Sequence, residues 1–272
     1  MSSNFKIFIL LLSMLLLLSC SSSRELQSTF FEGPTSDIDA LQSWITQNAE
    51  RHNYDGLIYY IVNDRDYLYA YLIITNPGFA RDAYRYGITT YFDKDFRRSY
   101  GLTFPTGILF GLSDFPGARK GFLENPSWEN VPENRELVRT AERMMPEQAK
   151  LMQRRDRRAD RSPARLPVSH LEAQGLKMHF DNSGRHPELL LRIPLEITRD
   201  QQFSLDVKPG QVIQFGVEVS PPELEEIERD DYMPDASDRF RQSQSRQMQQ
   251  QRSLANMLRG GFTFWTEVRL AE

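Results

Sequence analysis

Short runs of apolar residues, many of them alternating with polar ones, recur along most of the chain. Residues 57–62 and 67–75 are two such runs, and residues 63–66 between them are rich in the Asn and Asp that favour turns. This spacing predicts a β-hairpin, because alternation with a period of two is typical of a half-buried strand. Further strands are predicted at residues 87–92, 100–104, 176–180, 188–197, 211–219 and 261–270.

Eight short strands with few long helices favour a mainly β fold, an antiparallel β-sandwich of jelly-roll type. Two of the strands carry more specific expectations. Pro194 falls inside the strand at 188–197, which predicts an edge position or a bulge because proline has no amide hydrogen to donate. In the strand at 261–270, Phe264 and Val268 share one face and Trp265 lies on the other.

Apolar residues at helical spacing recur in three places. Residues 37–50 predict a short N-terminal helix with Ser36 as its N-cap, and residues 79–86 predict a second short helix. Residues 133–158 show a longer helical pattern, in which Pro146 should break or kink the helix.

The polar segments indicate one domain with two insertions. The β-sandwich domain is predicted to cover residues 36–272, with insertions at about 124–170 and 221–259. The first insertion is charged and partly helical, and the second is acidic and then rich in Gln, Ser and Arg. The second insertion has too few apolar residues to form a core.

The N-terminus has the pattern of an export signal. Lys6 is followed by an apolar stretch, residues 7–18, and then by Ser19 and Cys20. A bilayer takes about 20 residues in a helix, so a signal peptide at residues 1–19 is favoured over a transmembrane anchor.

Residues 17–20, Leu-Leu-Ser-Cys, resemble the lipobox of bacterial lipoproteins. The resemblance implies that lipid is attached to Cys20, that the chain is cut before this residue and that the new amino terminus is acylated. Several acyl chains form a stable membrane anchor, whereas one chain binds reversibly. Ser21, rather than Asp, follows the cysteine, which by the family's sorting pattern implies the bacterial outer membrane. Residues 20–35 are Ser-rich and polar, as expected of a flexible tether.

Composition narrows the classes of function. The 33 basic and 37 acidic residues nearly balance, so the net charge of −4 gives no general electrostatic reason to expect nucleic-acid binding. A single cysteine excludes an internal disulfide framework and a cysteine zinc cluster. The mean hydropathy of −0.53 excludes a polytopic membrane protein.

Three segments resemble the strands of a known group of β-sandwiches. Residues 63–72, residues 87–93 and residues 189–195 are similar to strand motifs of the group related to family 9 carbohydrate-binding modules and DOMON-like domains. The resemblance implies a β-sandwich over most of residues 54–270. For the sugar-binding members it also implies a glycan held between exposed aromatic rings, with calcium sites nearby.

Aromatic residues are the candidates for ligand contact. Tyr67, Tyr69 and Tyr71 share one face of a predicted strand by the period of two. If this face is exposed, its flat rings suit carbohydrate or protein contact. The alternative is that the rings belong to the core or pack beneath a helix. Trp128 is the one tryptophan in a predicted loop and is the fourth candidate.

Carboxylates in predicted turns are weak candidates for a calcium site. Asp64, Asp66, Asp93 and Asp95 follow predicted strands, and calcium prefers oxygen ligands of this kind. The alternative is ordinary turn chemistry, and the EF-hand spacing is absent after Asp93. The sequence indicates no cofactor other than this possible calcium ion.

The sequence shows no catalytic signature, because it has no Gly-rich phosphate loop, no HExxH and no Gly-x-Ser-x-Gly. His170, His179 and His186 lie close in sequence, but only His179 falls in a predicted strand, so structural or surface histidines are favoured over a metal site. The sequence therefore predicts a lipid-anchored extracytoplasmic binding module without catalysis, with carbohydrate as a candidate ligand. The alternatives are a structural or accessory envelope lipoprotein that contacts a protein partner and, more remotely, a hydrolase.

Overall fold

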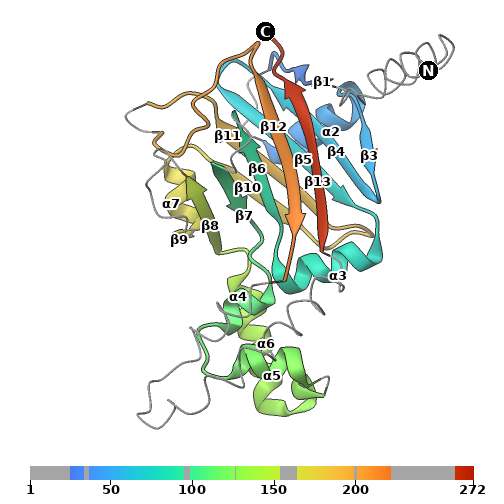
Figure 1. Ribbon diagram of the computed structural model, residues 1–272, viewed down its shortest axis with the longest axis vertical. Helices are drawn as coiled ribbons and strands as arrows, with labels where there is room; N and C mark the ends of the chain where they lie inside the picture. Colours follow the sequence, from blue (N-terminus) through green and yellow to red (C-terminus); the bar gives the residue numbers. More distant parts are fainter. Residues whose placement is uncertain are drawn as a thin grey trace, which may run out of the picture.

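The computed structural model describes residues 25–33, 37–94, 99–125, 127–153, 164–198, 201–221 and 261–272. Within them, two β-sheets pack face to face, which confirms the predicted mainly β sandwich (Figure 1). The signal peptide, Cys20, Asp95 and nearly all of the second insertion lie outside the described residues. No helix in the described part of the chain is both long and apolar enough to cross a membrane.

The two sheets differ in strand number. The seven-stranded sheet has the order β1-β13-β12-β6-β7-β8-β9, and the six-stranded sheet has the order β10-β11-β5-β4-β2, with β3 also paired to β4. The strands of the first sheet are β1 (Leu26–Gln27), β13 (Phe262–Arg269), β12 (Val212–Val219), β6 (Thr89–Asp93), β7 (Tyr100–Thr103), β8 (Gln148–Gln153) and β9 (Ala164–Pro167). The strands of the second are β10 (Lys177–Asp181), β11 (Glu188–Pro194), β5 (Tyr67–Ile74), β4 (Leu57–Asn63), β2 (Thr29–Phe30) and β3 (His52–Tyr54).

The predicted hairpin forms the centre of the six-stranded sheet. β4 and β5 pair in antiparallel register, with Tyr60 opposite Tyr71. Asp64 closes the turn between them, because its side chain accepts hydrogen bonds from the amides of Asp66 and Tyr67. Alternate residues of β5 point into the space between the sheets. These core residues are Leu68, Ala70, Leu72 and Ile74.

The sandwich is mostly antiparallel, with two short parallel pairs. β1 runs parallel to β13 and β2 runs parallel to β4, so the N-terminal segment adds one strand to each sheet. Buried Asn63 holds this segment to the C-terminus: its Nδ2 donates to the Ala271 carbonyl at 2.9 Å, and its Oδ1 accepts from the Ser28 hydroxyl. Side-chain hydrogen bonds thus align strands that no hairpin turn connects.

Helices cover one outer face and one end of the sandwich (Figure 1). α2 (Ile38–Asn48) lies on the outer face of the six-stranded sheet, and its own Ile45 is fully buried against that face. Its N-cap is Asp37, which accepts hydrogen bonds from two amides of the first turn, so the Ser36 cap predicted from the sequence is wrong. The other helices are α3 (Pro77–Tyr86), α4 (Ile108–Leu112), α5 (Ala118–Glu124), η1 (Trp128–Asn130), α6 (Pro132–Met144) and α7 (Val168–Ala173).

The predicted long helix is shorter than its apolar pattern suggested. α6 ends at Met144, and the chain enters β8 at Gln148, so the helical expectation beyond Met144 is wrong. Pro146 accounts for the change, because it cannot continue a helix, and the residues after it alternate between core and surface. β8 and β9 lie within the range assigned to the first insertion and pair with the seven-stranded sheet.

β11 is an interior strand, so the edge position predicted from Pro194 is not observed. Its pairing with β10 ends at Arg192, and Pro194 is the last residue of β11. Because β10 begins opposite Arg192 and does not extend to Pro194, the missing proline amide leaves no β10 carbonyl without its partner.

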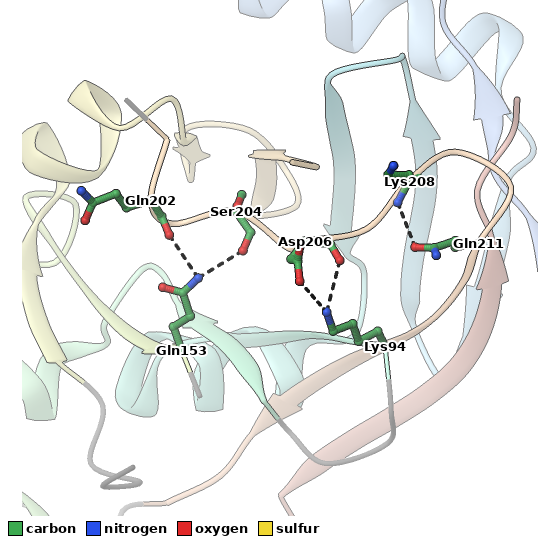
Figure 2. A network of polar contacts seen from close by, with 7 residues as sticks. All are labelled: Lys94, Gln153, Gln202, Ser204, Asp206, Lys208 and Gln211. Carbon is green, nitrogen blue, oxygen red and sulfur yellow. Dashed lines mark hydrogen bonds and ion pairs between the residues drawn. The ribbon is translucent and has the colours of Figure 1, made fainter. Parts of the chain in front are cut away.

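Residues 201–211 carry the chain from the six-stranded sheet to the seven-stranded sheet. Figure 2 shows Gln153, at the end of β8, pointing toward this crossing segment. Its side-chain amide donates to the carbonyls of Gln202 and Ser204, both at 3.2 Å. The backbone of the crossing segment is therefore held to the end of β8.

Two further contacts, from Lys94 and Tyr100, hold the crossing segment to the seven-stranded sheet. Lys94 pairs with Asp206 at 2.6 Å, and both side chains are at least half exposed (Figure 2). The buried Tyr100 donates its hydroxyl to the Phe203 carbonyl at 3.1 Å. Burial raises the pKa of Tyr100 well above its ordinary value of 10.0.

Candidate functional site

The outer face of the seven-stranded sheet carries a row of residues that lie directly opposite one another on five neighbouring strands. From β13 to β8 this aromatic row consists of Trp265, Gly216, Tyr91, Gly101 and Met152. Each of these residues has at least one neighbour along its strand that belongs to the core between the sheets. Because side chains alternate along a strand, the aromatic row points away from that core.

Two glycines allow the rings of the aromatic row to lie against the sheet. A Cβ atom at Gly216 would lie 2.6 Å from Cε3 of Trp265, and a Cβ atom at Gly101 would lie 2.9 Å from Cε1 of Tyr91. Any other residue at these two positions would displace a ring. The rings of Trp265 and Tyr91 have a centroid distance of 5.2 Å and an interplanar angle of 27°. They form a flat, half-buried aromatic surface.

Polar side chains flank the aromatic row on both sides. Thr89 and Thr103 pair across β6 and β7, and their hydroxyls share a hydrogen bond of 2.8 Å. Gln214 and Glu267 pair across β12 and β13 on the other side of the row. Figure 1 shows the described helices at the end and edges of this sheet and on the other sheet, not across the row. The face therefore combines flat apolar area with hydrogen-bonding groups at its borders.

The three candidate tyrosines lie on the outer face of the other sheet, beneath or beside α2. Tyr69 and Tyr71 are each only 3% exposed and pack with the residues of α2, so the structure matches the alternative in which a helix covers them. Tyr67 is half-buried, and the guanidinium of Arg192 lies 4.4 Å from the centre of its ring.

The hydroxyls of the two covered tyrosines, Tyr69 and Tyr71, donate hydrogen bonds to carboxylates. Tyr69 donates to Asp64 at 2.6 Å, and Tyr71 donates to Glu188. Burial first, and then these hydrogen bonds, raise the pKa of Tyr69 and that of Tyr71 well above 10.0. These two rings are structural supports of α2 and offer no exposed stacking surface.

Trp128 lies in neither sheet. It belongs to η1 in the helical end of the molecule, where its indole contacts Gly121 and meets Phe122 edge-on at a centroid distance of 6.3 Å. The structure therefore separates Trp128 from the candidate tyrosines and from the aromatic row.

The calcium candidates do not gather in the described part of the chain. Asp64 is committed to the β4–β5 turn, and Asp66 is exposed beside it. Asp93 is fully buried and accepts hydrogen bonds from residues 99–100. Among the described residues, no three His, Cys, Asp or Glu side chains form a group that could hold a metal ion. Asp95 lies outside those residues, so calcium binding stays a prediction.

Comparisons with known proteins found two similar solved structures and no family. No protein-family model matches the chain, and no curated protein matches it. Two solved structures of a family 9 carbohydrate-binding module from Caldicellulosiruptor kristjanssonii are similar, one in complex with cellotriose and one in complex with glucose. The first is 10% identical to this chain, with a TM-score of 0.33, and the match covers 74% of this chain and 79% of the module. The second is 8% identical, with the same TM-score, and the match covers 74% of this chain and 81% of the module. At this level the likeness carries no argument.

Sequence reasoning missed Tyr91 and Trp265 as site residues, because each was assigned only to a strand. A signal was nevertheless present in the interior glycines of the neighbouring strands, Gly101 and Gly216. Glycine weakens a strand and often marks a close approach of another group. Only the register between strands shows that the approaching groups are the two rings.

Proposed function

We propose that this chain is a non-catalytic, extracytoplasmic module that binds a carbohydrate chain on its aromatic row. The single observation that carries the proposal is that the Trp265 ring packs over Gly216 and the Tyr91 ring packs over Gly101, side by side. Flat amphipathic rings offer apolar area to the C–H faces of sugar rings. The polar side chains at both borders offer hydrogen bonds to the sugar hydroxyls.

The shape of the face favours a polymer over a small free sugar. Small ligands are usually held in a cleft that buries most of their surface. The aromatic row is instead a flat strip that crosses five strands, so a chain lying on it would contact both rings and both polar borders at once.

The test is retention of the purified full chain on insoluble polysaccharides, compared among Trp265→Ala, Tyr91→Ala and Trp128→Ala. Loss of a central aromatic contact typically costs about 2 kcal/mol, which is roughly 30-fold in affinity. We expect this loss for Trp265→Ala and Tyr91→Ala and no change for Trp128→Ala, with circular dichroism confirming that each variant is folded.

Two results would contradict carbohydrate binding. One is a screen of plant, fungal and bacterial polysaccharides in which none retains the chain while a fixed envelope protein is recovered with it. The other is unchanged retention of Trp265→Ala. Turnover of a retained polysaccharide by the full chain would contradict the non-catalytic assignment.

We also propose that the module is lipid-anchored at Cys20 in the bacterial outer membrane. The support is the lipobox-like run at residues 17–20 and the polar tether after it. The Cys20→Ala variant is expected to lose incorporation of labelled palmitate and to leave the membrane fraction. Unchanged labelling of that variant would refute the anchor.

A further inference from the structure

The other sheet carries a small hollow lined by basic side chains. It lies on the outer face of β10 and β11, beside the first turn of α2, and is shallow: its cavity volume is about 20 Å³, and it opens to solvent. Three basic residues line this basic hollow: Lys177 and His179 from β10, and Arg192 from β11.

The strand register places two of these cations side by side. Lys177 lies directly opposite Arg192 in the antiparallel pair of β10 and β11. Side chains in directly opposite positions start only about 5 Å apart, and like charges there are destabilising. Among the described residues, no carboxylate lies within ion-pair distance of either cation. The fold therefore retains a repulsion that an anion in the hollow would relieve.

The guanidinium of Arg192 also has a hydrogen-bond donor that the described residues leave unused. Its guanidinium stacks on the Tyr67 ring at 4.4 Å, and its Nη2 donates one long hydrogen bond, 3.4 Å, to the Gly175 carbonyl. Its Nε is buried and has no hydrogen-bond partner within the described part of the chain. A buried donor of this kind costs free energy unless something accepts its hydrogen bond.

The acidic residues nearby are engaged elsewhere. Asp37 lines the hollow, but its side chain caps α2 by accepting from the amides of Asp39 and Ala40. At the far end of the same strands, Asp181 accepts from the Ser183 amide and Glu188 accepts from Tyr71. Lys177 and Arg192 still outnumber Asp37 in the lining, which leaves one net positive charge among these three residues.

The floor of the hollow decides which anion suits it. Apolar side chains form that floor, and they are Ile38, Leu41 and Leu190. A free inorganic anion would lose hydration against this surface without gaining apolar contact. An organic carboxylate would place its body on the floor and its oxygens at the rim, where the guanidinium fork matches carboxylate geometry.

We infer that the basic hollow is a binding site for a carboxylate group carried on a small body with an apolar face, such as one hexuronate unit. Arg192 grips the carboxylate through its fork, Lys177 supplies the second positive charge, and the apolar floor contacts the C–H face of the ligand. This site lies on the opposite sheet from the aromatic row and does not depend on the carbohydrate binding proposed there.

The test uses the full chain in detergent with D-glucuronate as the probe, followed by calorimetric titration and by the midpoint of thermal unfolding. D-glucuronate is expected to bind saturably and to raise the midpoint, because it binds only the folded state. The neutral methyl ester of glucuronate should do neither. Arg192→Gln and Lys177→Gln should each weaken binding about tenfold or more, since each removes a charged partner. Lys208→Gln, which removes a cation from the crossing segment, and Trp265→Ala should bind glucuronate normally.

A second readout separates binding from a structural role. Without ligand, Lys177→Gln should unfold at the same or a higher temperature, because it relieves the repulsion with Arg192. A lower midpoint for ligand-free Lys177→Gln would overturn the proposal, as would equal binding of the ester or unchanged affinity in the two variants. Tighter binding of inorganic phosphate than of glucuronate would overturn the assignment to a carboxylate.

Discussion

Gly216 and Gly101 leave room for two aromatic rings because they have no side chain. In most strands an interior glycine only weakens the structure, because it loses more backbone freedom on folding and packs nothing. Here the rings of Trp265 and Tyr91 occupy the space that two Cβ atoms would fill. Each glycine therefore lowers the stability of its strand but allows an aromatic ring to lie flat against the sheet.

Replacement of Gly216 tests this link at the scale of one residue. In Gly216→Ala the new Cβ would sit 2.6 Å from the Trp265 ring, so the indole must move away from the sheet. We expect the free energy of unfolding to fall by about 1–3 kcal/mol, as for other overpacked sites, and the tryptophan fluorescence to shift toward that of exposed indole. Urea unfolding followed by fluorescence measures both.

Gly184→Ala is the matched control. Its Cβ would meet nothing closer than 3.9 Å, so its free energy of unfolding should stay within about 0.5 kcal/mol of the parent value. Equal effects of the two substitutions would show that Gly216 does not position the Trp265 ring.

Elements that connect the two sheets depend on contacts of very different strength. The crossing segment, residues 201–211, is held by the exposed Lys94–Asp206 pair and by the hydrogen bond from buried Tyr100 to the Phe203 carbonyl. The ion pair is closer, at 2.6 Å, but it is screened by water. Distance alone therefore misleads about which contact stabilises the segment.

Two substitutions rank these contacts. Tyr100→Phe removes the hydroxyl and leaves the Phe203 carbonyl without its donor, which should cost about 1–2 kcal/mol of unfolding free energy. Lys94→Ala should cost less than about 1 kcal/mol, as for other exposed pairs. Chemical denaturation of both variants checks the order, and a larger loss for Lys94→Ala would contradict it.

Across the whole molecule, buried tyrosines make the sandwich sensitive to alkali. Burial, with a smaller contribution from Glu50, raises the pKa of Tyr59 from 10.0 to about 12. The pKa values of four other tyrosines are also raised, and these are Tyr69, Tyr71, Tyr84 and Tyr100. In the unfolded chain the same phenols ionise near the ordinary value of 10.0, before they do so in the folded protein.

The sign of the pH dependence follows from this difference. Between pH 10 and pH 12 the unfolded state binds fewer protons at Tyr59 than the folded state does, so stability is complete below this window and is lost as pH rises through it. Urea unfolding at a series of pH values should show the decline, and ultraviolet absorbance should show tyrosinate appearing together with unfolding. Tyr59→Phe should flatten the decline. An identical profile for this variant would show that Tyr59 does not contribute.

The local pattern of the chain was sufficient to predict most strands and the mainly β class. The β4–β5 hairpin, the helix α3 and the two faces of β13 follow from alternation and turn residues, which act over a few neighbouring residues. Where a pattern was ambiguous, the prediction failed, as in the residues after Pro146, whose apolar positions fit both a helix and a strand.

The sequence by itself determined which side chains share a face of each strand, because that direction depends only on the local backbone. The tertiary structure decided which faces meet solvent and which strands become neighbours. α2 covers Tyr69 and Tyr71, while Tyr91 and Trp265 are brought together from distant parts of the chain by the register of β6, β12 and β13. Register and covering are set by packing between segments far apart in sequence, and so no local pattern contains them.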